Sequence, residues 1–192
     1  MKKLHNFNEV YDGQAVFRKV LEAMSNPGRK LSIAGQAEKM YGDNRIFLAL
    51  GMTLLDNETG FFVCGNKELS KELSLLTLSK ETSLEDADFI FTEEGESLSE
   101  IFEKAKCGTL SDPHKSATLI IRVTDKCDKQ LEIYGAGIDG SMSLEVPDVV
   151  DYAMELRQSQ EYEYPQGIDM IFTTDGGELF CIPRLVMKKE VR

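Results

Sequence analysis

The chain has 192 residues, 42% of them hydrophobic, and a formal net charge of −11 at pH 7. A chain of this length can bury roughly 70% of the surface that it exposes when unfolded, so one compact domain over residues 1–192 is expected. The longest apolar run, residues 46–55, has about half of the ~20 residues that a membrane-spanning helix needs. Because no apolar segment follows the lysines near the start, the sequence predicts a cytoplasmic protein without a membrane anchor.

The acidic charge is distributed unevenly along the chain. Residues 81–100 hold eight acidic side chains and no lysine or arginine. A nucleic-acid partner is therefore not expected, since binding to phosphate backbones depends on clustered cations. A small basic cluster can still act locally, because salt screens charges beyond about 8 Å. The candidates are Arg18, Lys19, Arg29 and Lys30 near the start, and Arg184, Lys188, Lys189 and Arg192 at the end.

The cysteine pattern does not indicate a metal site or a disulfide framework. Cys64, Cys107, Cys127 and Cys181 form no C-x-x-C pair, and the chain has only two histidines. Free thiols in a reducing compartment usually behave as small buried hydrophobes. We therefore expect buried or unreactive cysteines and no bound metal.

The first half of the chain shows an alternation of helices and strands. The expected elements are a helix between Asp12 and Pro27, an extended piece near Leu31 and Ile33, a helix over 45–55, a strand over 61–64, a helix over 67–80, a strand over 88–92 and a helix over 96–106. Asp12 and Asn44 are expected to cap the first two helices, and Pro27 with Gly28 to end the first.

The second half is richer in strands. The expected elements are strands over 117–123, 130–134, 168–173 and 178–182, and a helix over 147–160. The sequence TDGG between the last two strands is typical of a hairpin. Helices that alternate with strands, with antiparallel additions at the end, predict an α/β fold in which a mixed sheet lies between helical layers.

Three glycines, Gly135, Gly137 and Gly140, have the G-x-G-x-x-G spacing of dinucleotide-binding loops. Such a loop must open directly into a helix that receives the pyrophosphate. Here the following residues, SMSLEV, alternate between polar and apolar, which is typical of a strand. The glycines are therefore expected to connect two strands, where they supply positive φ angles, and not to bind a dinucleotide.

Few residues suggest chemistry on their own. Cys107 and His114 lie in one loop and are candidates for a thiolate–imidazolium pair, although sequence proximity does not place them in contact. Asp56 in DNETG is expected to form a turn. Asp169 stands just inside an apolar strand, and Arg184 is either its partner in a buried ion pair or a contact to phosphate.

Four stretches together resemble the PhnH family, a subunit of the bacterial carbon–phosphorus lyase system that uses phosphonates. They are FRKVLEAMSNPGRK at 17–30, LLDNETGFF at 54–62, GAGIDG at 135–140 and YPQGIDMIFTTDGGELFCIPR at 164–184. The resemblance extends from about residue 7 to the C-terminus. Each motif is short, and their order and spacing make the resemblance specific.

The resemblance implies a three-layer αβα sandwich similar to the large domain of pyridoxal-phosphate-dependent transferases, but without that cofactor. It also implies a homodimer within a core assembly with the G, I and J subunits. In that system the G, H, I and L proteins together displace adenine from a nucleoside triphosphate with a phosphonate. The H subunit is required, and no catalytic residue is assigned to it.

The motif residues divide into two groups. Candidates for ligand or subunit contact are Arg18, Ser25, Asp169 and Arg184. Candidates for a structural role are Pro27, Gly28, Gly135, Gly137, Pro165, Gly167 and Pro183. Two other functions stay open at this point: a homodimer that binds a phosphonate or nucleotide by itself, and an independent enzyme that uses pyridoxal phosphate.

Overall fold

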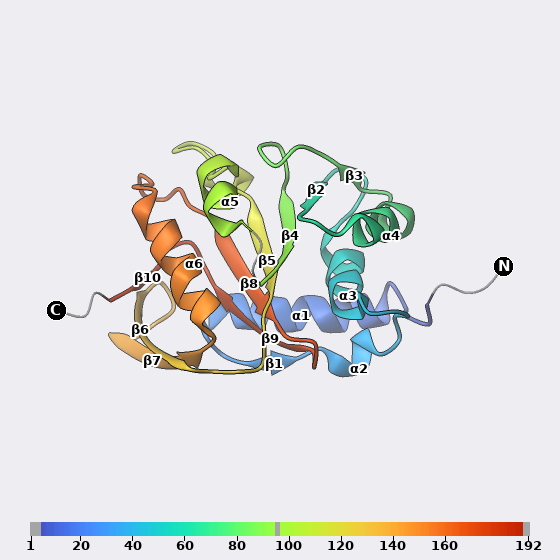
Figure 1. Cartoon of the computed structure of the whole chain (residues 1–192), viewed down its shortest axis with the longest axis horizontal. Helices are drawn as coiled ribbons and strands as arrows, with labels where there is room; N and C mark the ends of the chain where they lie inside the picture. The colour runs from blue at the N-terminus through green and yellow to red at the C-terminus, as the bar shows by residue number, and fades with distance from the viewer. Residues whose placement is uncertain (1–4, 95–96, 190–192) are drawn as a thin grey trace.

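The computed structural model describes residues 5–94 and 97–189 and has an α/β architecture (Figure 1). The strands of its main sheet are β1 (Leu31–Ser32), β2 (Gly60–Val63), β3 (Lys80–Glu81), β4 (Phe89–Glu93), β5 (Thr118–Arg122), β8 (Asp169–Thr173) and β9 (Glu178–Ile182). They are ordered β1-β9-β8-β5-β4-β2-β3. The neighbours from β3 to β8 pair in parallel, whereas β9 is antiparallel to both β8 and β1, which confirms the expected mixed sheet.

Helices cover both faces of this sheet. They are α1 (Tyr11–Ser25), α2 (Ala34–Ala37), α3 (Arg45–Leu54), α4 (Lys67–Thr77), α5 (Leu98–Lys104) and α6 (Asp148–Ser159), with a 3₁₀ turn over Pro113–Lys115. Because side chains alternate across a strand, Phe91 and Ile120 join the core beneath α1, α3 and α4, while Ile90 and Leu119 join the core beneath α5 and α6. Figure 1 shows α3 and α4 on one side of the central strands and α5 and α6 on the other.

A second, smaller sheet completes the layer that contains α6. It is antiparallel, with the order β10-β6-β7, and its strands are β6 (Lys129–Gly135), β7 (Ser141–Val146) and β10 (Val186–Lys188). Leu131, Ile133 and Val186 are buried in the same core as α6. The strand expected at 130–134 therefore belongs to this separate sheet, where it pairs with β7 in a hairpin and with the distant strand β10.

The expected cap of α1 is wrong, and that of α3 is right in position but makes no capping hydrogen bond through its side chain. Asp12 lies inside the first turn of α1, where its carboxylate accepts a hydrogen bond from the Asn8 N–H and pairs with Lys39, while the Asn8 side chain accepts from the N–H groups of Val10 and Tyr11. Asn44 precedes α3, but its side chain bonds other side chains instead of the helix. The local sequence does not show that the Asp12 and Asn44 side chains bind these partners and not the N–H groups at the start of the helix.

The helices end close to where the sequence predicts. At the end of α1, Gly28 has φ +77° and its N–H bonds the carbonyl of Cys181 in β9. The helix α4 ends three residues early, at Thr77, so that Lys80 and Glu81 form the short edge strand β3. Among the described residues, none of the helices combines the length and the apolar character needed to span a bilayer.

Candidate functional site

The sequence candidates Asp169 and Arg184 form a partly buried ion pair. Asp169 begins β8 and Arg184 follows β9, so the antiparallel pairing of these strands brings the two residues to the same edge of the sheet. Arg184 Nη2 lies 2.5 Å and Nε lies 3.1 Å from Asp169 Oδ2, and the Arg184 backbone N–H donates to Oδ1 at 2.8 Å. The side chains are 17% and 18% exposed. The remaining Arg184 nitrogen, Nη1, donates to the carbonyl of Pro113, so each of the three guanidinium nitrogens has a partner within the chain.

The YPQGID and IPR motifs meet around this pair. A Cβ added to Gly167 would lie 3.0 Å from the Cβ of Arg184, so the segment before β8 passes directly over the arginine. The Gly167 N–H bonds the carbonyl of Cys107, and the Pro183 carbonyl accepts from Val186. These two motifs therefore position the ion pair from both sides.

The GAGIDG motif forms the hairpin between β6 and β7, and the expectation of a strand-to-strand connection is confirmed. Gly135 has φ +129°, and a Cβ there would lie 2.3 Å from the Leu185 carbonyl oxygen. Gly137 has φ +84°, and a Cβ there would meet Pro27 at 3.1 Å and the Ser25 carbonyl at 3.2 Å. The hairpin is thus held against both the end of α1 and the segment after β9.

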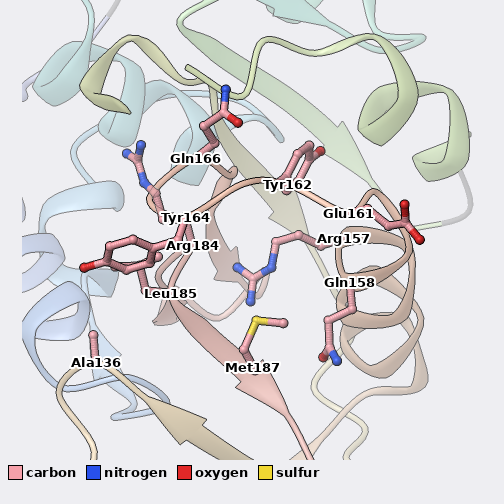
Figure 2. Close-up of a pocket in the computed structure, with 10 residues that line it drawn as sticks. All are labelled: Ala136, Arg157, Gln158, Glu161, Tyr162, Tyr164, Gln166, Arg184, Leu185 and Met187. Carbon is pink, nitrogen blue, oxygen red and sulfur yellow. The ribbon is translucent and has the colours of Figure 1, made fainter. Parts of the chain in front are cut away.

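A pocket of about 500 Å³ opens between this hairpin, the end of α6 and the segment that leads into β8. Figure 2 shows its lining residues, which are Ala136, Arg157, Gln158, Glu161, Tyr162, Tyr164, Gln166, Arg184, Leu185 and Met187. It lies at the amino-terminal edge of the parallel strands, whereas ligands of open α/β sheets usually bind at the carboxyl-terminal edge.

Arg157 is the most deeply buried polar group of this pocket. It is 3% exposed, and its guanidinium donates to four main-chain carbonyls. Nη1 reaches the carbonyls of Ile168 and Ile182 at 3.2 Å and of Pro183 at 3.1 Å, and Nη2 reaches that of Val186. Its Nε has no hydrogen-bond partner among the described residues.

Burial also changes the titration of the groups around the pocket. Loss of solvent lowers the pKa of Arg157 to about 10, an effect that the charge of Asp169 opposes. Burial raises the pKa of Tyr162 to about 12, and its hydroxyl donates to the Phe102 carbonyl. At neutral pH the pocket thus contains a buried cation and a neutral phenol. Its described lining includes no serine, cysteine, histidine or lysine, so it is suited to binding more than to proton transfer.

The other two candidates lie away from the pocket. Ser25 ends α1 behind the hairpin, and its hydroxyl donates to the Leu21 carbonyl. Arg18 is exposed on α1, about 10 Å along the helix from Ser25, and it makes no hydrogen bond or ion pair with the residues that the structure describes. It lies beside an exposed apolar stripe of Val10, Phe17 and Leu21, which recur on one face of the helix.

The weaker sequence candidates take structural roles. Within the described part of the chain, Cys107 and His114 make no contact; the Cys107 thiol donates to the Gly108 carbonyl, and His114 is exposed near Asp112. Asp56 accepts hydrogen bonds from the N–H groups of Glu58 and Thr59, which confirms the turn and lowers the pKa of its carboxyl. Cys181 is buried, whereas Cys127 is exposed beside Lys30, so the expectation of buried or unreactive thiols stays a prediction about reactivity for Cys127.

Most of the basic residues proposed as local clusters are neutralised by carboxylates. Arg29, Lys30, Lys188 and Lys189 each form an ion pair, and Arg192 lies outside the described residues. At the carboxyl-terminal edge of the sheet, Arg122 pairs with Glu93 and Asp175 beside a second pocket of about 400 Å³. The positive charge there is thus balanced.

Arg157 is the site residue that sequence reasoning missed. It falls on the apolar face of α6, in line with Val150, Ala153 and Met154. An arginine at a core position of an amphipathic helix is a signal of a buried charge that needs hydrogen-bond partners. Read in that way, the helical pattern would have identified it.

Comparisons with known proteins agree over nearly the whole chain. The family described as bacterial phosphonate metabolism protein (PhnH) matches residues 5–187. A C-P lyase subunit protein, HtxG of Stutzerimonas stutzeri, is 28% identical over 172 residues, which are 89% of this chain and 83% of that protein. The alpha-D-ribose 1-methylphosphonate 5-triphosphate synthase subunit PhnH of Rhizobium meliloti is 27% identical over 182 residues, 91% of this chain and 89% of that protein.

Proposed function

The chain belongs to the PhnH family of bacterial phosphonate metabolism proteins, and on that premise we propose that it is a required, non-catalytic subunit of a carbon–phosphorus lyase assembly. The assembly, with the G, I and L proteins, would transfer a ribose triphosphate from a nucleoside triphosphate to a phosphonate and release adenine. The observation that carries this proposal is the match over residues 5–187, with relatives whose names describe such subunits.

The chemistry of the pocket favours a non-catalytic role for this chain. Its described lining includes no serine, cysteine, histidine or lysine, the residue types that most often act as nucleophiles or proton carriers near neutral pH. The Arg184–Asp169 pair joins the start of β8 to the segment after β9. We therefore propose that the reacting groups belong to other subunits. We also propose, from the family assignment, that this chain acts with them in the cytoplasm.

Surface features of α1 support a role in assembly. Val10 is 71%, Phe17 49% and Leu21 54% exposed, and exposed apolar residues on one helix face are typical of protein contacts. Arg18 beside them adds a cation, a residue type enriched at interfaces. We propose that this α1 stripe contacts another subunit, in a homodimer or in the core with the G, I and J proteins.

An independent enzyme that uses pyridoxal phosphate is the weaker alternative. The proposed likeness to the large domain of transferases that use this cofactor concerns the fold alone. Such an enzyme needs a lysine to form the Schiff base. A third pocket, beside α5, is lined by Lys104, but this lysine pairs with Glu100 on the surface of the helix. Lys104 is therefore a poor candidate for the lysine that would bind pyridoxal phosphate.

Co-expression tests the subunit proposal directly. The chain is expressed with the G, I and J proteins of the same organism, and the mass of each species is measured by light scattering after size exclusion. A stable species that contains this chain is the expected result. Elution of the chain by itself, with the other subunits assembled without it, would overturn the proposal.

A further inference from the structure

We propose that the pocket between the β6–β7 hairpin and the end of α6 binds an uncharged, planar heteroaromatic ring that donates a hydrogen bond, the chemistry that nucleobases and indoles share. Its volume of about 500 Å³ lies in the range of pockets that hold small molecules. Residues of this chain form the pocket. The proposal therefore goes beyond the subunit role and does not depend on the assembly described above.

Three of the stretches that carry the family resemblance meet at this pocket. Ala136 belongs to GAGIDG, Tyr164 and Gln166 belong to YPQGID, and Arg184 is the last residue of IPR. The contacts of the glycines and of the ion pair explain how these segments fold. They do not explain Tyr164, whose large aromatic side chain is 80% exposed. An aromatic ring that is exposed beside a pocket is available for contact with a ligand.

The walls of the pocket are mainly apolar. Its aliphatic and aromatic lining residues are Ala136, Tyr162, Tyr164, Leu185 and Met187. The hydroxyl of Tyr162 donates to the carbonyl of Phe102 in α5, so the polar end of this side chain already has a partner. Figure 2 shows Tyr162 and Tyr164 on opposite sides of the pocket. A planar ring can stack on a tyrosine and bury its faces against these walls.

The two arginines of the pocket do not provide a site for an anion. Arg157 is 3% exposed, and its two Nη groups donate to four main-chain carbonyls. Each guanidinium nitrogen of Arg184 already has a partner, in Asp169 or in the Pro113 carbonyl. Glu161 is exposed, lines the same pocket, and forms no ion pair with the residues that the structure describes. Its carboxylate would repel a negatively charged ligand, so an uncharged ligand is favoured.

The side chain of Gln166 offers the pocket a hydrogen-bond acceptor. Its Nε2 donates to the Gly108 carbonyl at 2.9 Å, which fixes the orientation of the amide. Its Oε1 accepts no hydrogen bond from the described residues, whereas both ends of the Gln158 amide bond the main chain of Lys188. In Figure 2 the Gln166 oxygen lies on the side of Tyr162, and the nitrogen points away from the other lining residues. A ring N–H would supply the donor that this oxygen lacks.

Titration calorimetry on the purified chain tests the ligand class. The probes are indole, adenine, 1-methylindole, which lacks the N–H donor, and benzoate, which is an anion. We expect saturable binding of indole and adenine, about fivefold weaker binding of 1-methylindole than of indole, and at least about tenfold weaker binding of benzoate. Tighter binding of adenine than of indole assigns the nucleobase class, and the reverse order assigns indoles. No saturable binding of either ring would overturn the proposal and leave the co-expression result unaffected.

A pair of exposed tyrosines provides a matched control. Tyr164→Ala removes an aromatic ring from the pocket and should weaken the binding of indole about three- to tenfold. Tyr152→Ala removes a ring from α6 outside the pocket and should leave binding unchanged. Equal affinity of both variants would place the probe elsewhere on the chain and overturn the proposal.

The hydrogen bond to Gln166 is tested by a second matched pair. Gln166→Met removes the acceptor, so indole should lose its advantage over 1-methylindole in a protein whose circular dichroism is unchanged. Gln160→Met alters a glutamine at the end of α6 that does not line the pocket, and the advantage should persist. If Gln166→Met does not fold, Ala136→Trp fills the pocket from an exposed position and should abolish binding. An advantage that survives Gln166→Met, or unchanged binding in Ala136→Trp, would refute the site.

Discussion

The Asp169–Arg184 ion pair joins the start of β8 to the segment after β9, and its loss should destabilise the folded protein. Asp169→Asn keeps the shape of the side chain but leaves the Arg184 charge, 18% exposed, without its partner. We expect the free energy of unfolding to fall by about 2–3 kcal/mol. Urea denaturation at pH 7 measures it.

The control for this substitution is an exposed pair of the same type. Glu100→Gln breaks the contact with Lys104 on the surface of α5 and should leave the urea midpoint unchanged. Equal urea midpoints for Asp169→Asn and the wild type would contradict the prediction. They would show that the hydrogen bond of Arg184 to the main chain stabilises the fold without the ion pair.

A second prediction at the scale of residues concerns acid. The hydrogen bond from Lys39 and the one from the Asn8 N–H lower the pKa of Asp12 below its ordinary value. The folded state therefore favours the charged carboxylate, which stabilises the protein above the unfolded pKa of about 3.9. That stability is lost as the pH falls through the lower folded-state pKa.

The measurement compares Asp12→Asn with the wild type by urea denaturation at pH 7 and pH 3 (about one unit below the unfolded pKa). The variant should be less stable at pH 7, and the difference should shrink toward pH 3 and below. Glu9→Gln, which alters an exposed neighbouring carboxylate, should show no such trend. A stability difference between Asp12→Asn and the wild type that is constant with pH would show that the charge of Asp12 is not its cause.

At the scale of elements, the β6–β7 hairpin depends on its first glycine. Gly135→Ala places a Cβ 2.3 Å from the Leu185 carbonyl oxygen at φ +129°. We expect a loss of more than about 2 kcal/mol in the free energy of unfolding, from steric overlap together with backbone strain. Gly140→Ala in the same loop has φ +74° and open space around it, so it should lose only about 1 kcal/mol. Equal losses would show that the contact with the segment after β9 is loose.

Several elements could be predicted because their signals are local. The strands β4, β5, β8 and β9 lie within one or two residues of their expected positions, since each is an apolar run with clear flanking turns. The strands β3 and β10 were missed, because two or three residues carry no periodicity and their pairing is decided by distant partners. The same holds for the division into two sheets.

The residues of the candidate site also differ in how far the sequence could predict their roles. The pairing of Asp169 with Arg184 could be inferred as one of two alternatives, because a carboxylate in an apolar strand needs a partner. The motifs could not show that Arg18 lies apart from this pair, since a position in sequence does not specify the direction of a side chain. Arg157 was hidden within an apolar helix face, where only the tertiary structure supplies its four carbonyl partners.

At the scale of the whole molecule, the exposed stripe on α1 should determine association. Leu21→Glu places a charge within the proposed contact and should remove this chain from the assembled species in light scattering. Leu75→Glu alters a leucine of α4 that is also more than half exposed, and it should leave assembly intact. Both variants should melt at the wild-type temperature, because neither residue is buried.

A result in which both variants assemble normally would assign the interface to another face of the molecule. The charged edge formed by Arg122, Glu93 and Asp175 is then the next surface to substitute, because it lies at the opposite end of the strands from the Arg157 pocket.

Arg157 also has a mechanical consequence. Its guanidinium binds carbonyls before β8, at the end of β9 and in β10, so a single side chain ties the main sheet to the small one. Two sheets that share such a tie should open together in native-state hydrogen exchange, with the amides of β9 and β10 reporting one common opening free energy. The protein should therefore melt in a single cooperative transition, although it is built from two sheets.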